Sequence, residues 1–260
     1  MIPAWRTAVA LGVALAFAGT AVVAQLRLEE RRSGYADMGP ALRAMQDDDA
    51  ANPAMLWVLE GAALWARVAG AAGKSCADCH GAPESMTGVA ARHPAFDAAM
   101  GRPVTLEQRV NACRVERQQA PALAPESRES LALTALIAKQ SRGAPLAPPD
   151  DPRLEPSAAS GAALFERRQG QLNLSCAICH DDNHGRKLGA ATIPQGHPTA
   201  YPLYRLEWQG VGSLARRLRN CMIGMRAEPY AYGSPEYVDL ELFLARRARG
   251  MPSEAPGVRP

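Results

Sequence analysis

Aromatic residues are scarce in this chain of 260 residues, where Phe, Trp and Tyr together make up only 5%. A core that is short of large rings must gain its bulk elsewhere, and a large cofactor would supply it. An excess of charge of one sign is also lacking: the formal net charge of +3 does not indicate a nucleic-acid-binding protein. The 47% of hydrophobic and 21% of charged residues exclude a disordered or fibrous chain and are typical of a globular protein.

Long apolar runs are rare as well, and the one that stands out lies at the N-terminus. Residues 1–24 carry a single charge, Arg6, followed by an apolar stretch from Ala8 to Val23 and small side chains before Gln25. This pattern predicts a secretory signal peptide over residues 1–24. A membrane anchor is the alternative, but the run is short and weakly hydrophobic for one. We therefore expect an exported protein of the periplasm, with no membrane span after cleavage.

Three sequence blocks occur twice along the chain, in the same order. The first contains Gly-Ala-Ala-Leu-aromatic and Ser-Cys-Ala-x-Cys-His, and the second contains Leu-x-x-Arg-x-x-x-Cys. The paired blocks are 61–80 with 161–180, 106–114 with 214–222, and 131–145 with 238–252. This order predicts a tandem duplication of a small domain of about 100 residues.

The duplicated blocks also indicate the domain organisation. Apolar residues at helical spacing, with few alternating strand patterns, predict a mainly α fold. Five prolines in residues 143–160 predict an extended linker between the halves. We expect an N-terminal arm over 25–52, a first domain over 53–142 and a second domain over 161–260.

Six cysteines in an exported chain suggest disulfides, but four of them are spaced for another purpose. Residues 76–80 and 176–180 both read C-x-x-C-H, which is the attachment motif of c-type haem. In this motif two sulfurs form thioethers with the porphyrin, and the adjacent histidine binds the iron. A thioredoxin-like redox pair explains neither histidine, and an exported helical repeat is a poor zinc ribbon. The predicted attachment residues are Cys76, Cys79, Cys176 and Cys179, and the predicted iron ligands are His80 and His180.

The remaining two cysteines recur in register with the motifs. Cys113 follows His80, and Cys221 follows His180, at comparable separations, whereas no methionine or further histidine recurs in this way. We therefore predict His/Cys ligation of both haem irons, with thiolates that lower the reduction potential. The alternative is a single disulfide between Cys113 and Cys221, which would bridge equivalent points of two separate domains.

Arginines accompany both of these cysteines. Arg109 precedes Cys113 by one helical turn, and Arg217 precedes Cys221 in the same way, so each guanidinium would favour a thiolate. For Arg109, a surface role or a haem-propionate contact is equally open. Arg247 lies on the apolar stripe of its helix and should point inward. We therefore predict that Arg217 and Arg247 form an anion-binding site beside a sulfur nucleophile, Cys221, in the second half. The alternative is that the arginines form a solvated surface, as arginine runs more often do.

Much of the chain resembles a known family. The matching stretches, all within residues 52–259, are NPAMLWVLEGAALW, GKSCADCH, GQLNLSCAICHD, YPLYRLEWQ, RNCMIGMRAEP and LELFLARRARGMPSEAPGVR. In these stretches the chain closely resembles the SoxA family, the dihaem cytochrome subunits of the SoxAX complex of thiosulfate oxidation. The resemblance implies two tandem class I-type cytochrome c domains. It places His80 and Cys113 on the first haem iron, and His180 and Cys221 on the second.

The resemblance also implies an activity. Cys221 would be the active-site cysteine, as a thiolate or a persulfide, of an L-cysteine S-thiosulfotransferase. The partner in a heterodimer would be SoxX, a monohaem cytochrome, and the enzyme would join thiosulfate oxidatively to a cysteine of the SoxYZ carrier. Two electrons would leave through haem to a cytochrome c acceptor. Arg217 and Arg247 would hold the thiosulfate dianion.

Three other functions stay open on the sequence alone. A dihaem electron-transfer cytochrome without its own sulfur chemistry would leave Cys221 unmodified and inaccessible. A dihaem peroxidase needs an open or His/Met-ligated haem, which the paired cysteines disfavour. A thiol sensor would bind sulfur compounds at Cys221 without turnover.

Overall fold

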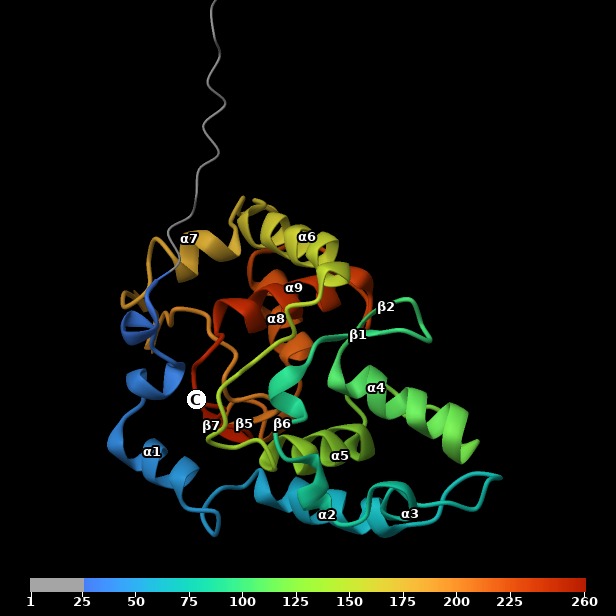
Figure 1. Ribbon diagram of the computed structural model, residues 1–260. Helices are drawn as coiled ribbons and strands as arrows, with labels where there is room; N and C mark the ends of the chain where they lie inside the picture. The colour runs from blue at the N-terminus through green and yellow to red at the C-terminus, as the bar shows by residue number, and fades with distance from the viewer. Residues whose placement is uncertain (1–25) are drawn as a thin grey trace, which may run out of the picture.

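The computed structural model describes residues 26–260, so the predicted signal peptide lies outside the described residues. The chain is mainly helical, as predicted, and its strands are only two or three residues long. The helices of the first half are α1 (Pro40–Asp47), α2 (Met55–Ala66), α3 (Ala77–His80), α4 (Leu106–Cys113) and α5 (Arg128–Lys139). Those of the second half are α6 (Glu155–Glu166), α7 (Cys176–His180), α8 (Leu214–Gly224) and α9 (Pro235–Arg247) (Figure 1).

Short elements connect these helices. Single 3-10 turns lie at Leu28–Glu30, Gly34–Asp37, Pro83–Met86, Ala90–Arg92 and Pro152–Leu154, and α4 continues into a π-helical turn at Arg114–Gln118. Two antiparallel hairpins pair β1 (Ala95–Asp97) with β2 (Arg102–Val104) and β3 (Lys187–Leu188) with β4 (Ala191–Thr192). A three-stranded sheet has β5 (Leu203–Arg205) at its centre, antiparallel to β6 (Gly210–Gly212) and parallel to β7 (Gly257–Arg259).

Each half is built on one close helix crossing, of α2 with α5 and of α6 with α9. A glycine makes each crossing possible. A Cβ atom at Gly61 would overlap the carbonyl group of Ala132, and one at Gly161 would overlap that of Asp239. The aromatic residue four positions after each glycine is buried in the core of its half. Close backbone approach therefore explains the Gly-Ala-Ala-Leu-aromatic pattern in both halves.

The helices that carry the two remaining cysteines begin on the same kind of cap. Thr105 Oγ1 accepts a hydrogen bond from Gln108 N at 3.3 Å at the start of α4. Ser213 Oγ accepts one from Arg216 N at 3.1 Å at the start of α8. Such caps satisfy N–H groups that have no partner within the helix. The caps stand at the same sequence separation before Cys113 and Cys221, so the two cysteines occupy equivalent helical positions.

The segment 143–160 is not an extended linker over its whole length, which corrects the sequence prediction. Its first part lacks helix, but α6 already begins at Glu155. Pro156 does not prevent this, because it occupies the first turn of α6, where its missing N–H would have no helical partner in any case. Proline content therefore predicted the break in helix but not where the next helix starts.

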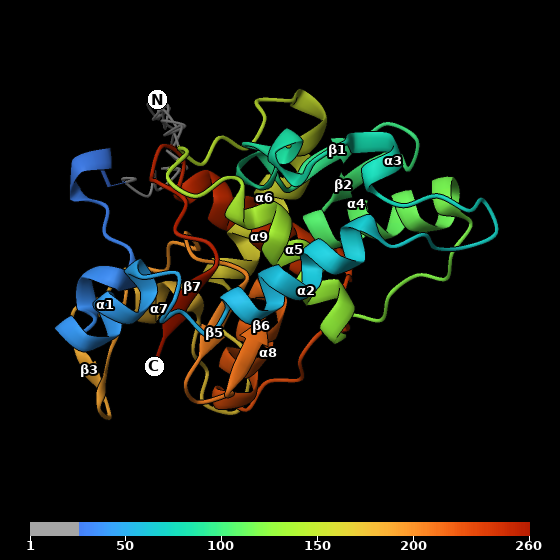
Figure 2. The ribbon, with the colours of Figure 1, turned by 90° about the horizontal axis from the view of Figure 1, so that it is seen from below.

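The N-terminal arm crosses to the second half of the chain. In Figure 1 it descends from α7 to α1 along one side of the molecule, and Figure 2 shows α1 beside β7 from another direction. Gln46 Oε1 accepts a hydrogen bond from Val258 N at 3.0 Å, and Asn52 Nδ2 donates to Pro256 O at 3.1 Å. Low periodicity in the sequence indicated an arm but not the surface that it covers.

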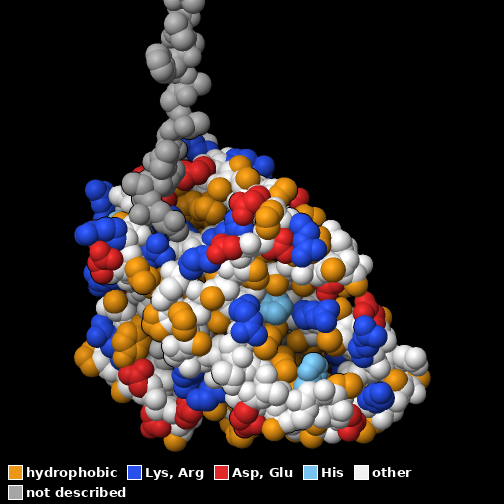
Figure 3. Space-filling view, in the orientation of Figure 1, with side chains coloured by type: hydrophobic (Ala, Val, Ile, Leu, Met, Phe, Trp, Pro, Cys, Tyr) orange, Lys and Arg blue, Asp and Glu red, His pale blue; other side chains and the backbone are white. Residues whose placement is uncertain are grey.

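The surface carries no field of a single sign on the face seen in Figure 3, where basic, acidic and apolar side chains are interspersed. This mixture agrees with the small net charge of the chain. Within residues 26–260, no helix combines the length and the apolar character that crossing a membrane requires.

Candidate haem-binding sites

The first C-x-x-C-H motif lies on the short helix α3 and is open to solvent. Cys76 is half-buried against the core of the first half, whereas Cys79 and His80 are exposed. Asp78 Oδ2 accepts a hydrogen bond from Ser75 N at 2.7 Å, which holds the turn before the helix. No side chain or backbone group of residues 26–260 hydrogen-bonds the imidazole of His80. The ring is therefore placed by its position on α3 and by the Trp65 indole, whose centroid lies 5.7 Å away.

The second motif forms α7 and is held at more points. Ser175 Oγ caps the helix by accepting a hydrogen bond from Ile178 N at 3.2 Å. His180 Nδ1 donates to the carbonyl oxygen of Pro194 at 2.7 Å, which orients the ring and leaves Nε2 free to bind a metal. Gly196 packs on the ring, since a Cβ there would lie 3.0 Å from His180 Cγ. Burial lowers the pKa of His180 and so favours the neutral imidazole, which is the form that binds a metal.

Cys113 and Cys221 each lie beside the motif of their own half. Cys113 is the last residue of α4, Cys221 lies in the last turn of α8, and both are half-buried. Burial raises the pKa of Cys176 to about 12, and the neighbouring Cys221 adds to the shift. Burial also raises the pKa of Cys76, and Cys113 contributes in the same direction. All six cysteines are free thiols in the structure, so the alternative disulfide between Cys113 and Cys221 is not formed.

The arginines around Cys221 differ in what they contact. Arg216 stacks on an indole ring at 4.5 Å, and Arg219 donates to a backbone carbonyl. The guanidinium of Arg217 is half-buried and has no hydrogen-bond or ion-pair partner within the described part of the chain. Burial raises the pKa of Tyr201 to about 12, and the fields of both Arg217 and Cys221 reach its hydroxyl. Arg217 is therefore an unpaired cation at the site of Cys221.

The equivalent arginine of the first half, Arg109, already forms an ion pair. Arg109 Nη1 donates to Asp97 Oδ2 at 2.6 Å, and the Asp97 side chain is buried. Hydrogen bonds from the backbone of Met100 and from this guanidinium hold the pKa of Asp97 below its usual range. The charge of Arg109 is balanced, so this arginine offers no free cation beside Cys113.

Arg247 points inward, as the helical stripe predicts, and is only 9% exposed. Its guanidinium forms an ion pair with Asp181, the residue after His180. Its Nη2 also lies 3.5 Å from the carbonyl oxygen of Gln195. The structure therefore places Arg247 beside the segments that hold His180, with its charge matched by a carboxylate, and leaves Arg217 as the unpaired member of the predicted pair.

Several buried polar atoms of the second half have no partner inside the protein. Among residues 26–260, both ring nitrogens of His197 and the Nε atoms of Arg205 and Arg247 are buried without a hydrogen bond. Such groups are costly to bury unless a ligand satisfies them. Two thiols on one helical turn, an adjacent neutral imidazole and nearby donors suited to carboxylates fit a covalently attached haem with its propionates. The residues of the second half therefore fit the group that their motif implies.

The geometry does not support a zinc site built from the four motif cysteines. Cys76 packs against the core of the first half and Cys176 against that of the second. Over residues 26–260, no three His, Cys, Asp or Glu side chains converge as the ligands of a metal ion would. The two cysteine pairs are therefore separate candidate attachment sites.

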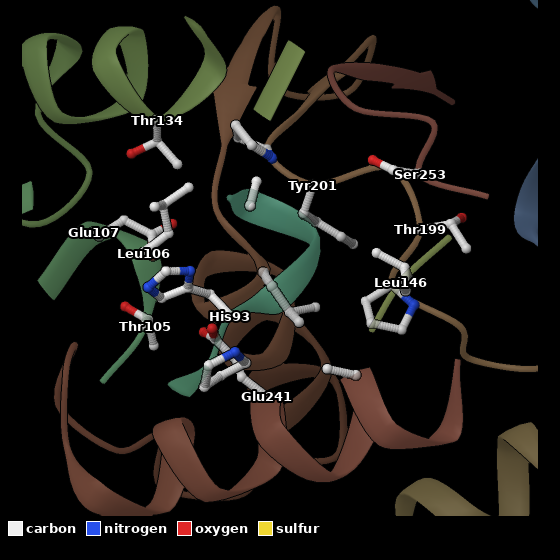
Figure 4. Close-up of a pocket in the computed structure, with 16 residues that line it drawn as sticks. His93, Thr105, Leu106, Glu107, Thr134, Leu146, Thr199, Tyr201, Glu241 and Ser253 are labelled. Carbon is white, nitrogen blue, oxygen red and sulfur yellow. The ribbon is translucent and has the colours of Figure 1, made fainter. Parts of the chain in front are cut away.

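A cavity of about 90 Å³ lies between the two halves, and none of its lining residues belongs to either motif. Figure 4 shows its polar side chains, which come from both halves of the chain. Burial raises the pKa of Glu241 well above its usual value, and Glu107 and Glu126 add to the shift. Burial lowers the pKa of His93. Sequence reasoning missed this cavity, because segments far apart in the chain meet there.

Known proteins match this chain along most of its length. The family model described as SoxA/TsdA, cytochrome c domain, matches residues 60–146 and 160–253. The L-cysteine S-thiosulfotransferase subunit SoxA of Rhodovulum sulfidophilum is 38% identical over 234 residues, which are 90% of this chain and 82% of that protein. The subunit of the same name from Paracoccus pantotrophus is 36% identical over 227 residues, which are 87% of this chain and 78% of that protein.

The fold agrees with these sequence matches. The crystal structure of SoxXA from Paracoccus pantotrophus matches with a TM-score of 0.85 at 35% identity, and the match covers 88% of this chain and 87% of that chain. The mainly helical architecture is therefore that of cytochrome c domains. By its sequence, its fold and its cytochrome c domain, this chain belongs to the SoxA family.

Proposed function

We propose that this protein is the SoxA subunit of an L-cysteine S-thiosulfotransferase, the name that its relatives carry. The enzyme joins thiosulfate oxidatively to a cysteine of a SoxYZ carrier protein. The partner subunit is a SoxX monohaem cytochrome, in line with the SoxXA complex whose structure this chain resembles. One observation carries the proposal: the half-buried Cys221 and the unpaired guanidinium of Arg217 belong to the same site.

Two covalently attached c-type haems belong to this proposal. Cys76 and Cys79 attach the first and Cys176 and Cys179 the second, with His80 and Cys113, and His180 and Cys221, as the respective iron ligands. When bound, each haem accepts and passes on one electron at a time. The hydrogen bond from His180 Nδ1 to the Pro194 carbonyl supports the assignment, because it presents Nε2 in a fixed direction.

The reaction forms one sulfur–sulfur bond. A carrier thiol and thiosulfate give a carrier S-thiosulfonate, one proton and two electrons. A cytochrome c would be the final acceptor of these electrons, and haem held by the motif residues would supply the one-electron chemistry. Cys221 provides the sulfur at which exchange takes place, as a thiolate or as a persulfide. Arg217 binds the thiosulfate dianion through charge-assisted hydrogen bonds, which its unpaired guanidinium can form without breaking an ion pair.

Arg247 has a different task in the proposed site. Its ion pair with Asp181 and its contact with the Gln195 carbonyl connect the two segments on either side of His180. We propose that Arg247 holds these two segments in place at the anion-binding site of the second half. Arg217 is the arginine that contacts the substrate.

The organisation of the chain is part of the same proposal. Residues 1–24 are a signal peptide and the mature protein acts in the periplasm. Residues 53–142 and 161–260 are tandem cytochrome c domains that arose by internal duplication, joined by the proline-rich segment that starts at residue 143. The paired glycine crossings and the equivalent helix caps support this origin.

Mass spectrometry and turnover test the proposal on the mature protein, isolated with its partner subunit from a host that attaches haem. We expect the polypeptide mass plus two haems and cyanide-labile sulfur on Cys221. We also expect thiosulfate-dependent reduction of a cytochrome c that requires the carrier protein. A bare Cys221 without such reduction would support an electron-transfer cytochrome instead. A disulfide between Cys113 and Cys221 would contradict the ligand assignment.

A further inference from the structure

The N-terminal arm, residues 26–52, contacts the second half near both of its ends. Figures 1 and 2 show it beside α7 and β7 from two directions. Near its start, Arg31 Nη1 donates to the carbonyl oxygen of Arg249 at 2.8 Å. Near its end, Gln46 Oε1 accepts a hydrogen bond from Val258 N at 3.0 Å. Between these two points the arm passes the segment that holds His180.

Gln195 connects the arm to that segment, residues 194–197. Its side chain is buried, and both ends of its amide are used by the arm. Oε1 accepts a hydrogen bond from Arg32 N at 2.6 Å, and Nε2 donates to the carbonyl oxygen of Glu30 at 3.2 Å. Both partners are backbone groups, so the connection depends on the path of the arm and not on its side chains.

The residues on either side of Gln195 both touch the ring of His180. Pro194 supplies the carbonyl oxygen that accepts from Nδ1 at 2.7 Å, and Gly196 packs against the ring carbons. The Gln195 carbonyl oxygen also lies 3.5 Å from Arg247 Nη2. Because these three residues are consecutive, an anchored Gln195 side chain fixes both contacts to the ring.

The first half has a C-x-x-C-H motif without this arrangement. His80 is exposed, and no group of residues 26–260 hydrogen-bonds its ring. Asp49 of the arm forms ion pairs with Lys139 and Arg142 of the first half. Within residues 26–260, however, no hydrogen bond or ion pair joins the arm to the motif at residues 76–80. A motif of this kind therefore forms in this fold without an anchored segment, so the anchor serves a need that is specific to the second site.

We propose that Gln195 is a positioning residue of the second haem site: by latching residues 194–197 to the arm, it fixes the direction in which His180 Nε2 points. The inference rests on the proposed assignment of His180 as an iron ligand and not on the sulfur chemistry of Cys221. Each of the two hydrogen bonds contributes modestly, so losing both raises the population of the unlatched segment on the order of tenfold or more. In the unlatched state the ring can turn, and the ligand field at the second site becomes heterogeneous.

Four variants separate this role from a general loss of packing. Gln195→Ala removes both hydrogen bonds, and Gln195→Glu places an acceptor opposite the Glu30 carbonyl. Gln46→Ala loosens the arm without touching residues 194–197. Gln140→Ala is the matched control, because Gln140 of the first half also donates to a backbone carbonyl, at 3.2 Å.

The readouts are haem content, the electron paramagnetic resonance of the ferric low-spin sites, and proteolysis of the arm, all on the haem-loaded complex with the partner subunit. The second site is assigned by its change in Cys221→Ala. In Gln195→Ala we expect two haems, an unchanged first-site signal, a second-site signal that broadens or splits, and arm cleavage about tenfold faster. Gln195→Glu should change the second-site signal and the cleavage rate in the same direction. Gln46→Ala should change them less, and Gln140→Ala should leave both unchanged.

The outcomes distinguish the inference from the function on which it rests. An unchanged second-site signal in Gln195→Ala, or an equal change in Gln140→Ala, overturns the positioning role and leaves the haem assignment intact. A wild-type protein with a single haem, or with no signal that responds to Cys221→Ala, overturns both.

Discussion

In both halves of this protein a glycine permits a close helix crossing, a C-x-x-C-H motif follows it, and a capped helix brings one more cysteine to the motif. The halves differ in the polar groups around these shared parts. His180 is hydrogen-bonded and packed, whereas His80 is exposed. Arg109 is balanced by Asp97, whereas Arg217 is unpaired. The comparison teaches that the repeated residues build a frame for a cofactor, while the residues that do not repeat decide what each site can do.

Other corresponding positions also carry different polar side chains in the two halves. Glu241 and Thr134 correspond in the third repeated block and both line the cavity between the halves. Arg247 corresponds to Gln140 in the same block. In each case the second half has an ionisable side chain where the first has a neutral one, so polar residues and not the scaffold distinguish the two halves.

Cysteine replacement tests the comparison most strongly. Cys221→Ala should lower the carrier-dependent turnover of thiosulfate on the order of 10³-fold or more, because it removes the sulfur that we propose to react. Cys113→Ala should change turnover by about twofold or less, because that site lacks an unpaired arginine. Steady-state reduction of the cytochrome acceptor measures both. Equal losses in the two variants would show that the halves are not functionally different.

Glycine replacement tests the shared frame. Gly61→Ala and Gly161→Ala should each destabilise the protein by about 3 kcal/mol, since the new methyl group overlaps a carbonyl across the helix crossing. Gly39→Ala is the control: a Cβ there meets no atom within 4 Å, and φ is −70°. Denaturant unfolding of the haem-loaded protein reports the change. A large loss in one half only would contradict the equivalence of the two crossings.

Arginine replacement tests which cation contacts the substrate. Arg217→Ala should lower kcat/KM for thiosulfate about 30-fold, which corresponds to about 2 kcal/mol for a hydrogen bond to a charged group. Arg217→Lys should recover part of the loss, because it keeps the charge but not the forked geometry. Arg109→Ala should leave kcat/KM within about twofold of the wild type. The proposal fails if Arg109→Ala costs as much as Arg217→Ala.

Glu241→Gln tests the smallest of these differences, the raised pKa of a carboxyl group in the cavity between the halves. Because the pKa of Glu241 is raised in the folded protein, the native state keeps a proton that the unfolded chain releases. Stability therefore falls as pH rises above the unfolded pKa of the carboxyl group. The variant does not titrate at this position, so it should gain stability relative to the wild type as pH rises above the unfolded pKa of the carboxyl group. Thermal unfolding at several pH values measures it, and parallel profiles of the two proteins would count against the raised pKa.

The parts of the fold that sequence patterns could predict are those that local spacing controls. Helical periodicity located α5 and α9, and the spacing of Cys76, Cys79 and His80 marked an attachment motif on a helical turn. The prediction of an extended linker over 143–160 was wrong from Glu155 onward, because a helix tolerates proline in its first turn. The cavity between the halves was missed, since no local pattern links residues that meet only after folding.

Short-range pattern was thus enough to determine the helical class, the two motifs, and the helical position of Cys221 one turn after Arg217. All of these depend on neighbours within a few residues along the chain. Packing in three dimensions alone made Arg109 and Arg217 different, and brought the arm against the segment that holds His180. The physical reason is that the deciding contacts, such as Asp97 with Arg109 and Gln195 with the backbone of the arm, join residues whose separation in sequence carries no periodic signal.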